Sequence, residues 1–183
     1  MRIFFTFLFS IILLSSQAQD KMSLRFSYLG HYLYQPGLKA SLHLNIFEKS
    51  KEKSTLSLFA EPGLGFYSHI NANSHVIAGT ELGLKRVGQK GFESSLSVGV
   101  NGCYRAVLLG LSSNLGNGET SSKDYEHRIY FLPTLNLTLG KNYEKLGWFI
   151  KASPGYFLSP NHPRSFALFA EVGIIFSLKK KEE

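Results

Sequence analysis

Apolar and polar residues alternate along nearly the whole chain after residue 20, and this alternation limits the possible folds more than any other feature. From Leu38 to Ile46, for example, the even-numbered positions are apolar and the odd-numbered ones are polar. Successive side chains of a β-strand point to opposite faces, so a period of two predicts strands with one apolar and one polar face. No segment after residue 20 keeps a helical period of 3.6. The chain is therefore predicted to be all-β.

The same alternation recurs in eight stretches, near residues 23–32, 38–46, 56–66, 78–85, 92–105, 128–139, 146–158 and 166–178. We expect strands of about 9 to 14 residues, whereas strands of soluble proteins usually have about 5 or 6 and membrane-spanning strands need roughly 9 to 11. Pro62, Pro133 and Pro154 lie inside these stretches on the apolar face. Because proline cannot donate a hydrogen bond to a neighbouring strand, we expect a bulge or local kink at each of them.

The composition of the two faces separates a membrane barrel from a soluble lipocalin, whose apolar face points inward. In a soluble barrel the polar face would meet water and carry many charges. Here it is rich in glycine and serine, with one or two charges per strand, which suits the narrow interior of eight strands. The other face is continuous Leu, Ile, Val and Phe, as lipid requires, and aromatic residues gather near strand ends as in membrane girdles: Tyr28, Phe66, Tyr104, Trp148, Tyr156 and Phe176. We therefore predict an eight-stranded antiparallel up-and-down transmembrane β-barrel.

The first eighteen residues have the features of a signal peptide. Arg2 is followed by an apolar run from Ile3 to Leu14, and Ser16 and Ala18 fit the small-x-small cleavage pattern. The run of about 12 residues is shorter than the roughly 20 that a spanning helix needs. We predict residues 1–18 as a cleaved signal peptide and residues 19–183 as the barrel domain.

The predicted connections alternate in length. Short charged turns are expected near 49–54, 88–91 and 141–145, and larger loops at 68–74, 108–125 and 159–164, with a tight Pro-Gly turn at 34–37. Outer-membrane barrels place short turns in the periplasm and longer loops outside the cell. Both termini are then expected on the periplasmic side.

The charge and the cysteine content argue against a nucleic-acid-binding protein and a disulfide-linked fold. The formal net charge is +7, but the basic residues concentrate in turns instead of clustering among exposed aromatics, so no nucleic-acid partner is predicted. Cys103 is the single cysteine, which rules out an internal disulfide. We interpret Cys103 as a small packed residue, the alternative being a reactive thiol.

The last strand carries a possible assembly signal, Glu171-x-Gly173-x-x-Phe176-x-Leu178. This polar-x-Gly-x-x-apolar-x-apolar form is similar to the signal that barrel-assembly machineries read. With Tyr34-Gln35-Pro36-Gly37-Leu38-Lys39, Ala78-Gly79-Thr80-Glu81-Leu82-Gly83 and Phe169-Ala170-Glu171-Val172-Gly173, it makes the chain resemble small outer-membrane β-barrel proteins of Bacteroidota-type bacteria, in the architectural class of OmpA/OmpX-type barrels. The resemblance implies a fold and a location in the cell outer membrane, and it brings no catalytic residues.

Charged residues on the polar face predict a network inside the lumen, formed by Arg25, Lys39, His43, Glu61, Glu81, Lys151 and Glu171. A lone carboxylate in a narrow lumen would be costly, so these groups should form pairs. We expect Lys151 to pair with Glu171 on the neighbouring strand, and Glu61 and Glu81 to share a cation such as Lys39 or Arg25. Two adjacent carboxylates can also mark acid-base catalysis, which is the alternative interpretation.

Three functions remain open at this stage. The favoured one is a non-enzymatic barrel of the cell envelope with a structural or surface-interaction role; the others are a small solute conduit and a lipid A-modifying enzyme. No catalytic residue, cofactor or metal is predicted, since the sequence lacks a phosphate-binding glycine loop and metal-spaced Cys/His clusters. The expected partners are outer-membrane lipid and lipopolysaccharide and, during insertion, the barrel-assembly machinery. We expect a monomer, with any extracellular ligand left open.

Overall fold

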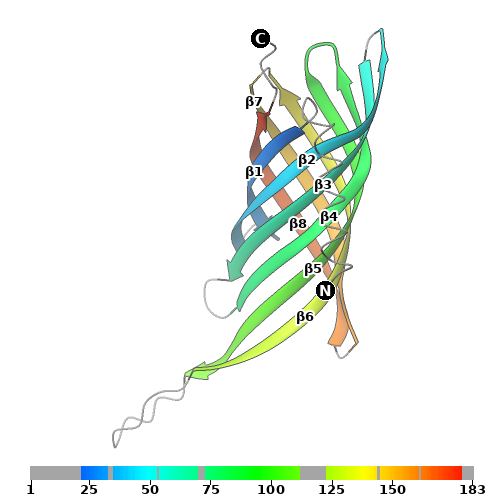
Figure 1. The fold of residues 1–183 in the computed structure, drawn as a ribbon. Helices are drawn as coiled ribbons and strands as arrows, with labels where there is room; N and C mark the ends of the chain where they lie inside the picture. Colours follow the sequence, from blue (N-terminus) through cyan, green and yellow to red (C-terminus); the bar gives the residue numbers. More distant parts are fainter. Residues whose placement is uncertain are drawn as a thin grey trace, which may run out of the picture.

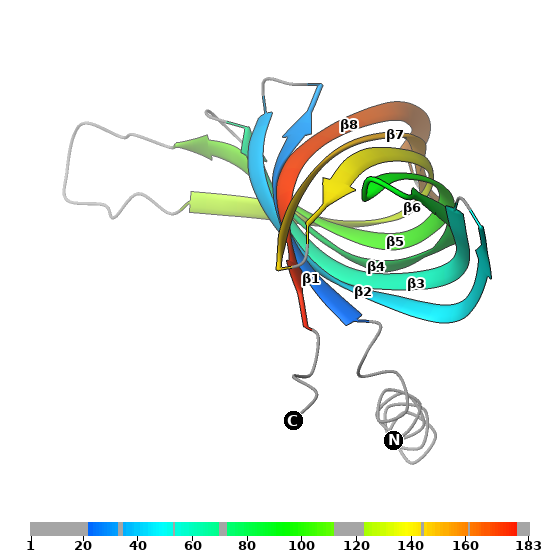
Figure 2. The same cartoon turned by 90° about the horizontal axis from the view of Figure 1, so that it is seen from above.

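Eight antiparallel strands form a closed barrel in the computed structural model (Figures 1 and 2), which confirms the predicted fold class. The structure describes residues 22–32, 35–52, 54–69, 73–111, 123–143, 145–160 and 162–178, so the predicted signal peptide lies outside the described residues. Each strand pairs with its neighbours in sequence, and β1 closes the ring against β8. The strands are β1 (Met22–His31), β2 (Gln35–Lys51), β3 (Ser54–His69), β4 (Asn73–Gly88), β5 (Phe92–Leu111), β6 (Lys123–Asn142), β7 (Leu146–Ser159) and β8 (His162–Ser177). In the described part of the chain no helix has the length and apolar character to cross a membrane.

The two ends of the barrel are distinct. Leu178 N donates to Met22 O at 3.0 Å, so both ends of the described chain meet at one rim, which we call the terminal end. The turns at 52–53, 89–91 and 143–145 share this rim, while the connections 32–34, 70–72, 112–122 and 160–161 join strands at the opposite rim, the loop end. An even number of strands in up-and-down order requires this arrangement.

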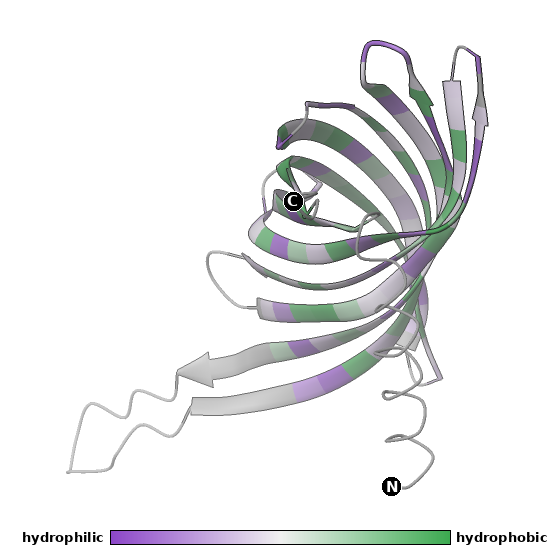
Figure 3. Cartoon of the chain, turned by 45° about the horizontal axis from the view of Figure 1, so that its top comes forward, coloured by the Kyte–Doolittle hydropathy of each residue, from purple (hydrophilic) through white to green (hydrophobic). Residues whose placement is uncertain are grey.

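Hydrophobic and hydrophilic residues follow one another along the strands (Figure 3), and this alternation sets which side chains face inward. On β1, Arg25 and Ser27 are buried in the lumen, whereas Phe26 and Tyr28 are exposed on the outside. The outer face exposes large apolar residues all round the ring, with exposed fractions that reach 74% at Ile129. The apolar outer face is confirmed, and the inner face is polar over part of its height.

Six strands are longer than predicted, with 16 to 20 residues, whereas β1 with 10 residues and β7 with 14 have the predicted length. The longer strands continue through most of the segments expected as loops, so only the 112–122 connection remains long and the others at both rims are short. The predicted contrast between short turns and longer loops therefore holds for one loop alone. Backbone pairing does not require apolar and polar residues to alternate, so strands can continue where the sequence has no such pattern.

The longest hairpin extends past the loop-end rim (Figures 1 and 2). The last pair between β4 and β5 is Asn73↔Val107, and the last between β6 and β7 is Phe131↔Leu158. Beyond these positions residues 108–111 of β5 and 123–125 of β6 pair only with each other in the described part of the chain. We call this two-stranded segment the β5–β6 arm.

The three prolines keep the register instead of producing bulges, so the expectation of a bulge at each was wrong. Pro133 and Pro154 each pair without interruption with one neighbouring strand and interrupt the ladder between β6 and β7. In the described strands, Thr134↔Gly155 is the one β6–β7 pair between Phe131↔Leu158 and Leu137↔Ala152. The pairs on either side of it are missing because they need the backbone N–H that proline lacks. The register shifts lie elsewhere, at Asn45/Phe47, Leu108/Gly110 and Phe157/Ser159.

Candidate functional site

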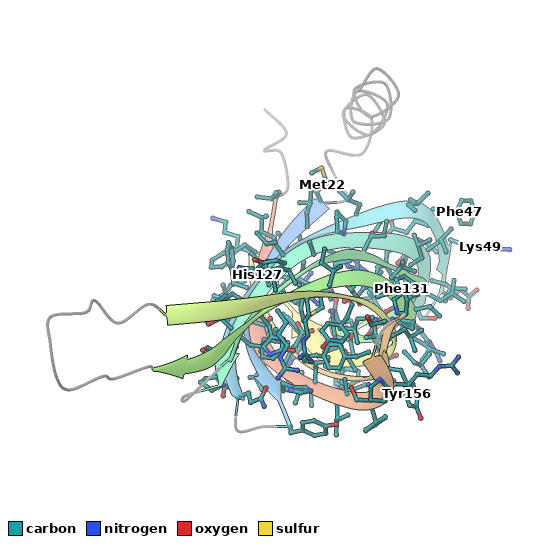
Figure 4. The ribbon with its side chains drawn as sticks, turned by 90° about the horizontal axis from the view of Figure 1, so that it is seen from below. Met22, Phe47, Lys49, His127, Phe131 and Tyr156 are labelled. Atoms are coloured by element: carbon teal, nitrogen blue, oxygen red, sulfur yellow. The ribbon has the colours of Figure 1, made fainter. Side chains whose placement is uncertain are left out.

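The lumen is filled with side chains (Figure 4), and its buried charged side chains form one layer. We call this the charged layer. It contains Arg25 from β1, Lys39 and His43 from β2, Glu61 from β3, Glu81 and Lys85 from β4, Glu93 from β5, Lys151 from β7 and Glu171 from β8. The seven residues predicted from the sequence all lie in this layer. Lys85 and Glu93 belong to it as well, although the predicted network did not include them.

Glu61 is the most connected carboxylate of the charged layer. Its Oε2 accepts from Arg25 Nη1 at 3.1 Å and lies 2.9 Å from His43 Nδ1. Its Oε1 accepts from Ser41 Oγ at 2.9 Å and from Lys151 Nζ at 2.9 Å. A buried carboxylate needs this many donors because it has lost its hydration.

Lys151 joins the two carboxylates that face each other on β3 and β4, Glu61 and Glu81. Besides the Glu61 contact, Lys151 Nζ lies 3.0 and 3.2 Å from the two oxygens of Glu81. Glu81 and Glu61 thus share a cation, but it is Lys151 and neither Lys39 nor Arg25. With both oxygens of each group engaged and the side chains buried, the arrangement is that of an ion-pair network.

Glu171 has a different partner from the one predicted. Lys151 and Glu171 are directly opposite in the β7–β8 register, but Glu171 Oε1 accepts from Lys39 Nζ at 3.0 Å and its Oε2 from Ser27 Oγ at 3.0 Å. Lys39 also reaches Glu81, at 3.0 Å. The expectation of a direct Lys151–Glu171 pair was wrong because lysine is long enough to cross the narrow lumen to β3 and β4.

The terminal-end side of the charged layer rests on apolar side chains. Arg25 Nη2 donates to Glu93 at 2.7 Å, and its guanidinium lies 5.2 Å from the centre of the Phe149 ring. The His43 ring lies 4.5 Å from the Phe59 ring and its Nε2 is 2.8 Å from Lys85 Nζ. Buried rings therefore keep water away from this side of the ion pairs.

A second layer, toward the loop end, is apolar and was missed by the sequence interpretation. This apolar cluster consists of Leu29, Tyr67, Ile77, Cys103, Tyr130, Leu132, Phe157, Ala167 and Phe169. All of them fall on the inward phase of their strands, and that position was the signal that could have revealed them. Cys103 is fully buried there, consistent with its interpretation as a packed residue.

The four residues of the possible assembly signal occupy different environments. Glu171 is in the charged layer, while Phe176 and Leu178 are exposed on the outer face. Gly173 faces inward, where an added Cβ would lie 2.7 Å from Cε1 of Phe149 and would also meet the carbonyl of Phe26. The glycine therefore has a packing reason of its own, and the recognition role of the motif stays a prediction.

The charges of this layer balance. Four cations (Arg25, Lys39, Lys85 and Lys151) face four carboxylates (Glu61, Glu81, Glu93 and Glu171). Within the described ranges no group of three or more His, Cys, Asp or Glu side chains is placed to hold a metal ion. The fold and this site define a class: closed eight-stranded antiparallel barrels with an apolar outer face and an ion-paired interior.

No protein-family model matches the chain, and no curated protein matches its sequence. Among solved structures, Neisserial surface protein A is 9% identical with a TM-score of 0.46, over 86% of this chain and 94% of that chain. The β-domain of the Bordetella autotransporter BrkA is 11% identical with a TM-score of 0.47, over 84% and 67% of the two chains. The N-terminal β-barrel domain of Pseudomonas aeruginosa OprF is 12% identical with a TM-score of 0.43, over 86% and 97%. Nothing about function follows from likeness at this level, and the resemblance to barrels of Bacteroidota-type bacteria stays a prediction.

Proposed function

We propose that the chain is an outer-membrane protein of the cell envelope whose closed, non-conducting barrel serves a structural or surface-interaction role. The observation that carries this proposal is the filling of the lumen by two successive layers, the charged layer and the apolar cluster. A barrel filled in this way acts through its outer surface and its rims and not through a pore.

The outer face supports the membrane part of the proposal. Soluble proteins rarely expose continuous apolar surface, whereas Leu82, Val98 and Leu135, on three different strands, are each more than half exposed. On β8 the exposed aromatic residues Phe166 and Phe176 are ten positions apart. That separation is about 33 Å along the strand and about 25 Å along the axis at a tilt of roughly 40°, which matches the apolar band of outer-membrane barrels.

The interior supports the non-conducting part. A cavity of about 30 Å³ lies between the two layers, lined by Lys39, Glu81 and Glu171 on one side and by Leu29, Leu132 and Phe169 on the other. This volume is close to the share of one water molecule, roughly 30 Å³. Ions or solutes crossing the barrel would have to displace both the paired charges and the rings above them.

The loop end supports a surface-interaction role. Among the described residues, the backbone of the β5–β6 arm has no further strand beside it, and such edges are ready to pair with another chain. At its base, Tyr104 Oη lies 2.6 Å from His127 Nδ1 on the outer surface. The arm thus extends the sheet beyond the membrane belt, where a partner can reach it.

Two experiments test the proposal. In cells, the protein should fractionate with outer membranes and change its gel mobility when left unheated, as closed barrels do. Release into the soluble fraction would refute the membrane assignment. In planar lipid bilayers, the purified barrel should give no current steps at concentrations at which a porin control conducts. Regular steps would favour the solute conduit over the structural role.

A further inference from the structure

The cavity of about 30 Å³ between the two layers of the lumen has one polar and one apolar side. Its polar side is formed by Lys39, Glu81, Thr134, Asn136, Ser153 and Glu171, and its apolar side by Leu29, Ile77, Leu132 and Phe169. A cavity of about 10 to 15 Å³ is enough to hold one water molecule, which needs roughly two to four polar partners. The volume meets the first requirement, and the polar side decides the second.

Ser153 on β7 has a buried hydroxyl group that is not satisfied by the protein. The residue is 4% exposed, and its Oγ has no hydrogen-bond partner among the described residues. Leaving a buried hydroxyl group unpaired costs free energy, so nearly all such groups in folded proteins bond to protein or to ordered water. Because Ser153 lines the cavity, a molecule bound there can be its partner.

The two strands beside the cavity are also incompletely paired. Thr134 on β6 pairs with Gly155 on β7. The same register puts Asn136 opposite Ser153, but the described β6–β7 ladder has no pair at that height. Both of these residues are buried and line the cavity. A molecule in the cavity can therefore connect β6 and β7 where the backbone ladder is interrupted.

Two further groups around the cavity have hydrogen-bonding capacity left. Lys39 Nζ donates to Glu81 and to Glu171, at 3.0 Å each, and an ammonium group has a third N–H. Thr134 Oγ1 accepts from Asn101 Nδ2 at 3.4 Å, and among the described residues its own O–H has no acceptor. Together with Ser153 these groups supply about three partners, the usual number for a buried water molecule.

The charge balance of the lumen favours a neutral occupant over an ion. The four cations and four carboxylates of the charged layer compensate one another, so an added ion would be buried without a counter-charge, which is costly. The carboxylates of Glu81 and Glu171 would attract a cation, but Lys39 already bridges them.

We propose that the cavity is a binding site for one internal water molecule, which hydrogen-bonds to Ser153 Oγ and links β7 to Thr134 on β6 and to Lys39 on β2. The water completes the polar layer at the interrupted β6–β7 ladder. The inference goes beyond the proposed function, because a closed, non-conducting barrel does not itself require water at this height.

The test is a crystal structure of the purified barrel at a resolution that shows ordered water, from crystals grown with and without a rubidium salt. We expect one electron-density peak within hydrogen-bonding distance of Ser153 Oγ, unchanged by rubidium. Absence of a peak in the wild-type barrel would overturn the proposal. A peak with the anomalous signal of rubidium would also overturn it, in favour of a site for a monovalent cation.

Two variants test the role of the serine hydroxyl group. Ser153→Val removes this group and fills the cavity with methyl groups, so the peak should be lost. Ser57→Ala is the matched control, because Ser57 is a buried inward serine that does not line the cavity, and the peak should be kept. A peak that persists in Ser153→Val, or that disappears in Ser57→Ala, would contradict the proposed site.

A measurement in solution keeps the inference testable where a variant does not crystallise or fold. In deuterated micelles, the amide protons of Ser153 and Thr134 in the wild-type barrel should show a nuclear Overhauser effect with water, of the sign that a long-lived complex gives. A wild-type barrel without this signal would refute the bound water. Current steps in bilayers would contradict the proposed function instead, so the two failures are distinguishable.

Discussion

Replacement of Lys151 by methionine tests the charged layer most directly. Lys151 Nζ has three contacts, at 2.9 Å to Glu61 and at 3.0 and 3.2 Å to Glu81, and its side chain is 1% exposed. Without it the layer has three cations for four buried carboxylates. Breaking a buried ion pair by removing one partner costs about 3 to 5 kcal/mol. We expect a value near the lower figure, because Glu61 keeps Arg25 and Glu81 keeps Lys39.

Double variants then decide which carboxylate the lysine serves. Lys151→Met with Glu81→Gln restores the charge balance, so it should be more stable than the sum of the two single losses by about 1 to 3 kcal/mol, the range for residues in one network. Lys151→Met with Glu171→Gln is the matched control: Glu171 is opposite Lys151 in the register but is held by Lys39 and Ser27. Its coupling should be smaller.

The assay is unfolding by urea in detergent micelles, followed by the fluorescence of Trp148, the single tryptophan, which is exposed on the outer face. Unheated gel mobility is the control for barrel closure. If the losses in Lys151→Met and Glu81→Gln simply add, the charges are independently hydrated. The lumen would then be wet, and the conduit function would gain support over the structural one.

Three further experiments test the faces and the packing of the barrel. Leu82→Arg on the lipid face should cost about 2 to 4 kcal/mol of unfolding free energy in lipid vesicles, whereas Leu82→Met should cost less than about 1.5 kcal/mol; equal losses would contradict a lipid-facing position. Gly173→Ala should cost about 1 to 3 kcal/mol because the new methyl group would press on Phe149, while Gly102→Ala, with its nearest added contact at 3.8 Å, should be near neutral in the same urea assay. Cys103 should react with a water-soluble maleimide only after urea unfolding, and rapid labelling of the folded barrel, measured by mass spectrometry, would contradict its burial.

The alternation of the sequence was sufficient to predict the strands and their faces, and insufficient to predict where the strands end. Between Leu38 and Ile46 one face meets an apolar surrounding and the other the lumen, so the pattern is strict. In the β5–β6 arm the backbone pairs in the same way without such a pattern. Hydropathy alone therefore predicts these strand ends poorly.

The contents of the lumen were predictable by position but not by partner. The inward positions on their strands predicted that Arg25, Glu61 and Lys151 lie in the lumen. The contact between Lys151 on β7 and Glu61 on β3 was not predictable, because the pairing register relates only neighbouring strands. Tyr67 and Phe169 were missed because the inner face was treated as polar throughout. The interior of a narrow barrel must be filled by side chains as well as balanced in charge, and here aromatic rings fill part of it.

Pro133 and Pro154 make the density of backbone hydrogen bonds uneven around the barrel. Both withhold their backbone donors from the same seam, so the β6–β7 ladder has fewer hydrogen bonds per length than the continuous ladder between β4 and β5. A barrel opens locally where the fewest hydrogen bonds hold its strands together. The amide protons of Thr134 and Gly155 should therefore exchange with solvent before those of the β4–β5 ladder. Local separation of strands would thus begin between β6 and β7, at the height of Asn136 and Ser153. The hydrogen bonds that close the barrel between β1 and β8 would stay intact.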